Sequence, residues 1–228
     1  MKFGLVEYLM GLFTIIPITV GFARIKVIHK SYYWLLMYLG IDLLFELTAP
    51  FVYGFLYMNI IQNIVHYTSV FCLLILLYKW GYLKNNKSVQ RLLLILFVSL
   101  LIIELLTQNN AQLKTPWYFM IFSFSWIITA VDYINNGLSN SNRKKTNWSQ
   151  LLILFPLITT MIYYIILHIL MANLYNKETE QLFRTLYGVI NFLQIASQLC
   201  FALALFWAPK KEVYLESLEE HLSPKMAN

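Results

Sequence analysis

Charged residues are scarce in this chain. Asp, Glu, Lys and Arg make up 12% of its 228 residues, whereas 59% are apolar. Because about a quarter of the residues in soluble domains are charged, the composition excludes an ordinary soluble globular protein. The net charge of +6 does not indicate a nucleic-acid partner, since the basic residues sit in short loops between apolar runs, where they orient a chain in a membrane.

Cysteine is also rare, with Cys72 and Cys200 as the two examples. Both lie inside apolar runs, and neither has a histidine or second cysteine at the spacing of metal ligands. We therefore expect two small apolar core residues, and the sequence leaves it unknown whether any metal binds.

Three signature motifs are missing. No lysine occurs between Leu182 and Trp207, which excludes a retinal pigment because that chromophore needs a Schiff-base lysine in the last helix. The Pro-Gln pairs of the PQ-loop sugar transporters are absent, since the residues after Pro17, Pro116 and Pro156 are Ile, Trp and Leu. No His-Glu-x-x-His motif supports a zinc hydrolase.

Long apolar runs are what the chain does contain. Runs of about 17–25 residues are typical of membrane-spanning helices, and seven are present. They cover residues 4–23, 32–52, 60–78, 92–106, 117–134, 151–171 and 182–207. The sequence predicts an all-α polytopic membrane protein with one seven-helix transmembrane domain over residues 1–208 and a charged cytoplasmic tail over 209–228.

Basic residues predict how this bundle is oriented, because Lys and Arg collect in cytoplasmic loops. Thirteen of the 17 follow the first, third, fifth and seventh runs, and the other four, Lys2, Lys114, Lys177 and Arg184, lie on the opposite side. This distribution places the N-terminus outside and the C-terminus in the cytoplasm. It also predicts a multi-pass protein of the bacterial cytoplasmic (inner) membrane.

Two acids interrupt the second run. Asp42 and Glu46 are one helical turn apart and therefore share a face. An ionised acid near the bilayer centre costs at least about 2.5–3.5 kcal/mol, so both must face a bundle interior, be protonated or meet partners on other helices. A hydrogen-bonded pair that shares one proton is the structural alternative.

Further polar and aromatic residues fall in the predicted outer half of other helices. Lipid offers no partners for such groups, so we expect them to line a water-filled outer pocket with the acid pair. The candidate ligand-binding residues are Asp42, Glu46, Asn63, His66, Glu104, Trp126, Tyr163 and Asn191. For Trp126 simple packing remains an alternative, for His66 a satisfied interior histidine, for Glu104 contact with interfacial water, and for Asn191 an amide contact between helices.

The segments around residues 43–79 resemble a loosely defined group of uncharacterised bacterial seven-helix inner-membrane proteins. The resemblance rests on Leu-Leu-Phe-Glu46-Leu, on Asn63-Ile-Val-His66-Tyr-Thr and on the closing Leu77-Tyr78-Lys79, and it covers the second and third runs only. It implies a sensory or signalling role, because such proteins are often encoded beside sensor histidine kinases. The group often has an acid in the middle of the third helix, where this chain has Ser69-Val-Phe71.

These observations predict a receptor-like or sensor-associated membrane protein. Its outward pocket would bind a small polar ligand, cation or proton, chiefly through Asp42, Glu46 and His66, and would signal to a membrane or cytoplasmic partner. A small proton- or cation-coupled transporter and a structural subunit of a membrane complex are alternatives, followed by an intramembrane zinc hydrolase. We expect no catalytic residues and no cofactor, although a bound cation or lipid fits the composition.

Overall fold

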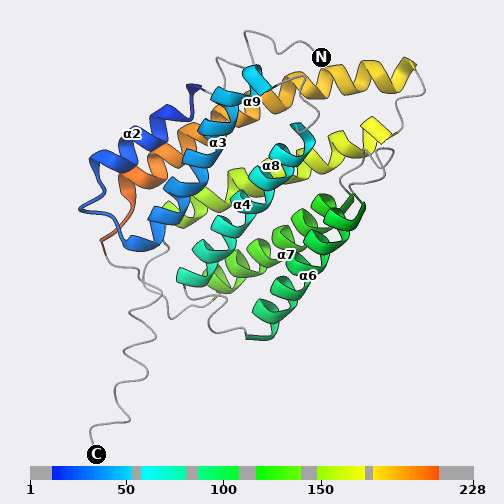
Figure 1. Ribbon diagram of the computed structural model, residues 1–228. Helices are drawn as coiled ribbons and strands as arrows, with labels where there is room; N and C mark the ends of the chain where they lie inside the picture. Colours follow the sequence, from blue (N-terminus) through cyan, green and yellow to red (C-terminus); the bar gives the residue numbers. More distant parts are fainter. Residues whose placement is uncertain are drawn as a thin grey trace, which may run out of the picture. The chain divides into compact units, whose positions relative to one another are not determined.

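The computed structural model describes residues 12–52, 58–80, 87–107, 117–139, 148–172 and 177–210, and these residues form helices and no strands (Figure 1). The expectation of an all-α fold is therefore confirmed. Among the described residues, Gly188–Trp207 is one 20-residue segment that is long and apolar enough to cross a membrane.

Seven α-helices and one short 3-10 helix make up this part of the chain. In chain order they are α2 (Ile15–Ala23), η1 (Lys30–Tyr32), α3 (Tyr33–Val52), α4 (Met58–Lys79), α6 (Lys87–Thr107), α7 (Trp117–Ser139), α8 (Trp148–Ala172) and α9 (Lys177–Trp207).

Several helices extend beyond the apolar runs that predicted them. The helix α6 begins at Lys87 rather than Leu92, and α9 begins at Lys177 rather than Leu182. Hydropathy detects only the apolar part of a helix. Charged side chains such as Lys and Arg are good helix formers and continue the helix past the end of its apolar run.

The helices belong to two compact units. Unit 1 comprises Met1–Asn86, Asn147–Leu152 and Gln198–Asn228, and unit 2 comprises Lys87–Thr146 and Ile153–Ser197. Unit 1 therefore holds α2, η1, α3, α4, the first turn of α8 and the C-terminal part of α9, whereas unit 2 holds α6, α7 and most of α8 and α9.

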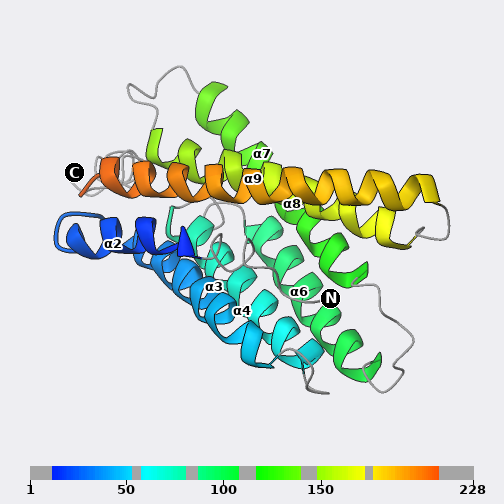
Figure 2. The same ribbon diagram turned by 90° about the horizontal axis from the view of Figure 1, so that it is seen from above.

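Close helix packing defines unit 1. Figures 1 and 2 show α2, α3 and the C-terminal end of α9 side by side. At Gly21 on α2 the approach to α3 is so close that an added Cβ would collide with the Leu36 side chain. Between α3 and α4 the contact is the most extensive of the helix pairs described, and it begins where the Tyr32 and Trp80 rings meet with centroids 5.9 Å apart.

Long-range hydrogen bonds fasten one end of unit 1. The Arg24 guanidinium donates to the Leu205 carbonyl at 3.1 Å, and its carbon lies 5.6 Å from the centre of the Phe206 ring. The His29 backbone N–H donates to the Pro209 carbonyl at 2.8 Å. Within the turn, the Tyr33 hydroxyl donates to the Ile25 carbonyl at 2.8 Å. The α2–α3 connection is thus tied to the end of α9.

Unit 2 contains two helix pairs with defined contacts. One is α6 against α7. In the other, α8 and α9, the Thr160 and Ser197 hydroxyls are 3.2 Å apart, and Ile190 is buried against Tyr163, Leu170 and Leu186. These contacts run antiparallel, as a helical hairpin requires.

Apolar side chains are exposed along whole faces of several helices. The exposed faces carry Leu92, Ile95, Val98 and Ile102 on α6, Ile121, Phe124, Ile128 and Val131 on α7, and Phe192, Leu199, Leu203 and Phe206 on α9. Spacings of three, four and seven residues place each set on one side of its helix. Continuous apolar surface of this kind marks a face that contacts lipid or another apolar partner.

Candidate functional site

The two acids of α3 lie on the inward side of their helix. Leu35 and Leu39, both 0% exposed, precede Asp42 and Glu46 at spacings of four, three and four residues, which is one helical face. Asp42 and Glu46 are half-buried, whereas Leu44 on the opposite side is 64% exposed. By their helical spacing, the acids continue the face that Leu35 and Leu39 bury, and Leu44 and Thr48 are exposed.

The Tyr32–Trp80 contact fixes which part of α4 lies opposite the acids. The two helices are antiparallel and rise equally per residue. A residue a given number of positions after Tyr32 in α3 should therefore lie opposite the residue the same number of positions before Trp80 in α4. Ten residues beyond Tyr32 is Asp42, and ten residues before Trp80 is Val70, next to the buried Ser69. In the same way, Glu46 is fourteen residues after Tyr32 and His66 is fourteen residues before Trp80, so Glu46 should lie opposite the backbone of His66.

This register brings three candidate positions of unit 1 to one region of the α3–α4 hairpin: Asp42, Glu46 and the backbone of His66. Asn63 is one turn further along α4. The side chains of Asn63 and His66 lie outside the described residues. Of these groups, the structure describes the side chains of Asp42 and Glu46, and carboxylates inside an apolar helix are groups that can exchange protons or bind a cation.

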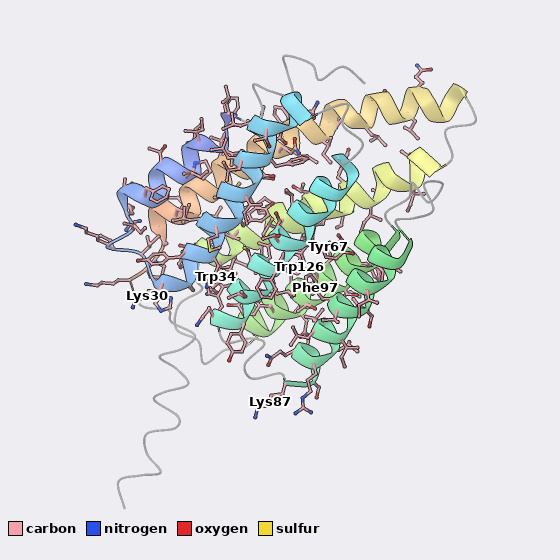
Figure 3. All side chains as sticks on the ribbon, in the orientation of Figure 1. Lys30, Trp34, Tyr67, Lys87, Phe97 and Trp126 are labelled. Carbon is pink, nitrogen blue, oxygen red and sulfur yellow. The ribbon has the colours of Figure 1, made fainter. Side chains whose placement is uncertain are left out.

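In unit 2, Trp126 lies on the buried face of α7. It is 1% exposed, and Ser123 three residues earlier is fully buried; Figure 3 labels Trp126. Within the part of the chain that the structure describes, neither the Ser123 Oγ nor the Trp126 Nε1 has a hydrogen-bond partner. Both residues lie on one face of α7, three residues apart, and each has a buried donor that could bond to an acceptor oxygen.

Tyr163 and Asn191 belong to two helices of unit 2 that pack together, α8 and α9. Tyr163 on α8 packs against Ile190, the residue before Asn191 on α9, and both side chains are half-buried. The structure thus places this pair at the α8–α9 contact. Glu104 belongs to α6, and its side chain is outside the described residues.

Several buried polar residues were missed by reasoning from charge. Ser69, Ser123 and Ser197 are buried, as is the Thr129 hydroxyl that donates to the Ser125 carbonyl at 2.8 Å. From the sequence, charged, amide and aromatic residues were selected as site candidates, and these hydroxyls were not. Their spacing on the inward helix faces is the signal that would have found them.

Comparison with models of protein families, with characterised proteins and with solved structures gives no match for this chain. Over the residues that the structure describes, the fold is all-helical and has one helix that is both long and apolar enough to span a membrane.

Proposed function

We propose that the chain is a multi-pass protein of a bacterial cytoplasmic membrane with its N-terminus outside. The exposed apolar faces of α6, α7 and α9 support this proposal. So do Thr48 and Thr159, whose exposed hydroxyls donate to the carbonyls four residues earlier at 2.8 Å and 2.7 Å. A hydroxyl bonded to its own helix needs no water, and is therefore compatible with lipid.

Its function, in this proposal, is that of a receptor-like or sensor-associated protein that binds a small cation or proton. The observation that carries the proposal is the inward position of Asp42 and Glu46 beside α4. Acids that point away from an apolar outer face are positioned to bind a cation or a proton. Acids needed only for solubility would face outward. Binding would change the α3–α4 packing and pass that change to a membrane or cytoplasmic partner.

The binding step is tested by the melting temperature of the full chain in nanodiscs. Measurements across pH and with Na⁺, K⁺ or Mg²⁺ are made for the parent, Asp42→Asn, Glu46→Gln and the control Asp132→Asn, because Asp132 is exposed on α7. All four proteins also carry His29→Gln, so that titration of the His29 imidazole does not add to the pH dependence of the melting temperature. We expect a cation- or pH-dependent shift in the parent and control only. The same shift in all four proteins would refute the proposed site.

The signalling step is tested by trypsin cleavage after Lys210, which follows α9. With the cation that stabilises the parent, we expect the cleavage rate to change in the parent and to stay constant in Glu46→Gln. If the cation does not change the cleavage rate in either protein, the signalling step is refuted, and only the binding step of the proposal remains.

A coupled carrier is the second candidate. Gln198 is buried, and its Oε1 has no hydrogen-bond partner among the described residues, which supports a polar route beyond the acid pair. Proteoliposomes that contain a pH-sensitive dye separate the two candidates. A cation-driven change of internal pH that is lost in Glu46→Gln favours the carrier, and cation binding with no internal change favours the receptor.

A further inference from the structure

One end of unit 1 gathers basic side chains from separate segments. Arg24 and Lys26 belong to the turn after α2, Lys30 begins η1, Lys79 ends α4, and Lys210 follows α9. All four lysines are exposed. We call these five residues the basic end; Figure 3 shows Lys30 where the chain from α2 enters α3.

Hydrogen bonds hold the basic end together. The bonds from Arg24 to the Leu205 carbonyl and from His29 to the Pro209 carbonyl fix the α2–α3 turn beside the residue that precedes Lys210. The positive charges of Lys30 and Lys79 both act on the His29 ring, so both lysines lie near it. The cations are therefore grouped by the fold rather than scattered over a surface.

Acidic residues are absent from the described segments that form the basic end, and the nearest acid in sequence is Glu212, two residues after Lys210. Residues 24–33, 76–80 and 203–210 include no Asp or Glu. Beside the basic end, the side chains of Phe206 and Trp207 are more than half exposed. Cations next to exposed apolar surface suit a ligand with an anionic part and an apolar part, because the anionic part can contact the cations and the apolar part can contact the apolar surface.

We propose that the basic end binds the phosphate headgroup of an anionic phospholipid, with the acyl chains against Phe206 and Trp207. Lys30 and Lys79 contact the phosphate, and Lys26 and Lys210 add to the local potential. Arg24 has a structural role, because its guanidinium is engaged by the Leu205 carbonyl and lies beside the Phe206 ring.

His29 makes this binding dependent on pH. Burial first, and then the charges of Lys30 and Lys79, lower the pKa of His29. Arg24 in the preceding turn and Lys210 after Pro209 add further positive charge to the surrounding segments. A bound phosphate offsets this charge and favours the imidazolium, so lipid retention should rise as the pH falls from about 8 to about 5.

The test is native mass spectrometry of the full chain after exchange into phosphatidylglycerol or phosphatidylcholine. The double variant Lys30→Gln, Lys79→Gln is compared with the control Lys87→Gln, Arg91→Gln, whose residues are exposed on α6 in unit 2. At about 1 kcal/mol per basic residue, retention of phosphatidylglycerol should fall about tenfold or more in the first variant and stay unchanged in the control. Lys30→Arg, Lys79→Arg should restore it, which separates lost charge from misfolding.

Three results would overturn the proposal. They are equal retention of the two lipids by the parent, an equal loss in the control variant, or displacement of phosphatidylglycerol by millimolar inorganic phosphate, which would show a site for free phosphate. Retention by His29→Gln that still rises at low pH would refute the role of His29.

Discussion

Unit 1 and unit 2 hold their helices together in different ways. At the basic end of unit 1, the contacts are charged or backbone groups joined over long sequence distances, as in Arg24 to the Leu205 carbonyl. Along α8 and α9 in unit 2, the contacts are apolar packing around Ile190 and one pair of hydroxyls, Thr160 and Ser197.

In the proposed membrane arrangement, this difference follows from access to water. A charged group is stable at the end of a bundle, where solvent and headgroups are near, and becomes expensive within an apolar span. A serine or threonine hydroxyl is tolerated within the span because it can also bond to its own helix, as Ser197 does to the Leu193 carbonyl at 2.8 Å. The two kinds of contact should therefore respond differently to substitution.

The largest effect is expected at Arg24. Arg24→Ala removes the hydrogen bond to Leu205 and the contact with the Phe206 ring, and it should lower the free energy of unfolding by about 2–3 kcal/mol. The measurement is equilibrium unfolding in detergent. Lys26→Ala, at an exposed position two residues later, should cost less than about 0.5 kcal/mol. Equal losses would show that charge, rather than the specific contacts, stabilises this end.

Gly21 and Gly40 form the next comparison. Gly21→Ala should cost about 1–3 kcal/mol, because the new Cβ collides with the buried Leu36 side chain. Gly40→Ala in α3 should stabilise by up to about 1 kcal/mol, because an added Cβ meets no described atom within 4 Å and alanine favours the helix. Thermal unfolding of both variants tests the close α2–α3 approach, which a neutral Gly21→Ala would contradict.

In unit 2 the adjacent Thr159 and Thr160 provide a matched pair. Thr160→Val removes the contact with Ser197 between helices and should cost about 0.6 kcal/mol. Thr159 is bonded only to the Phe155 carbonyl among the contacts described, so Thr159→Val should change the stability little. A double-mutant cycle with Ser197→Ala measures the coupling, and additive effects would show that the hydroxyl pair contributes nothing.

The smallest effect is expected from the pH response of His29. Its pKa is lowered from the usual 6.5 by burial and by Lys30 and Lys79, so below about pH 6.5 the unfolded chain binds more protons than the folded one. Stability should therefore decrease as the pH falls through this window and stay constant above it. Lipid-free unfolding at several pH values should show this slope in the parent and a shallower one in His29→Gln; equal slopes would exclude the contribution.

The register of α3 and α4 shows where sequence reasoning stops. The four-residue spacing of Asp42 and Glu46 predicts a shared face, and the apolar runs predict helices that the structure confirms as an all-α fold. Nothing in the spacing says that this face continues from the buried Leu35 and Leu39, or that Ser69 lies near the level of Asp42. Those relations depend on contacts between residues far apart in the sequence.

The basic residues show the same division. The chain alone shows that these residues collect after the first, third, fifth and seventh apolar runs, and this pattern predicts that the four segments lie on one side of a membrane. Only the tertiary structure joins Arg24 to Leu205 and His29 to Pro209. Local sequence determines helix formation and the polarity of each helix face, because both arise from neighbouring residues. Which faces meet is decided by packing between distant segments, because the fit of particular side chains, such as Gly21 against Leu36, exists only once the helices are together.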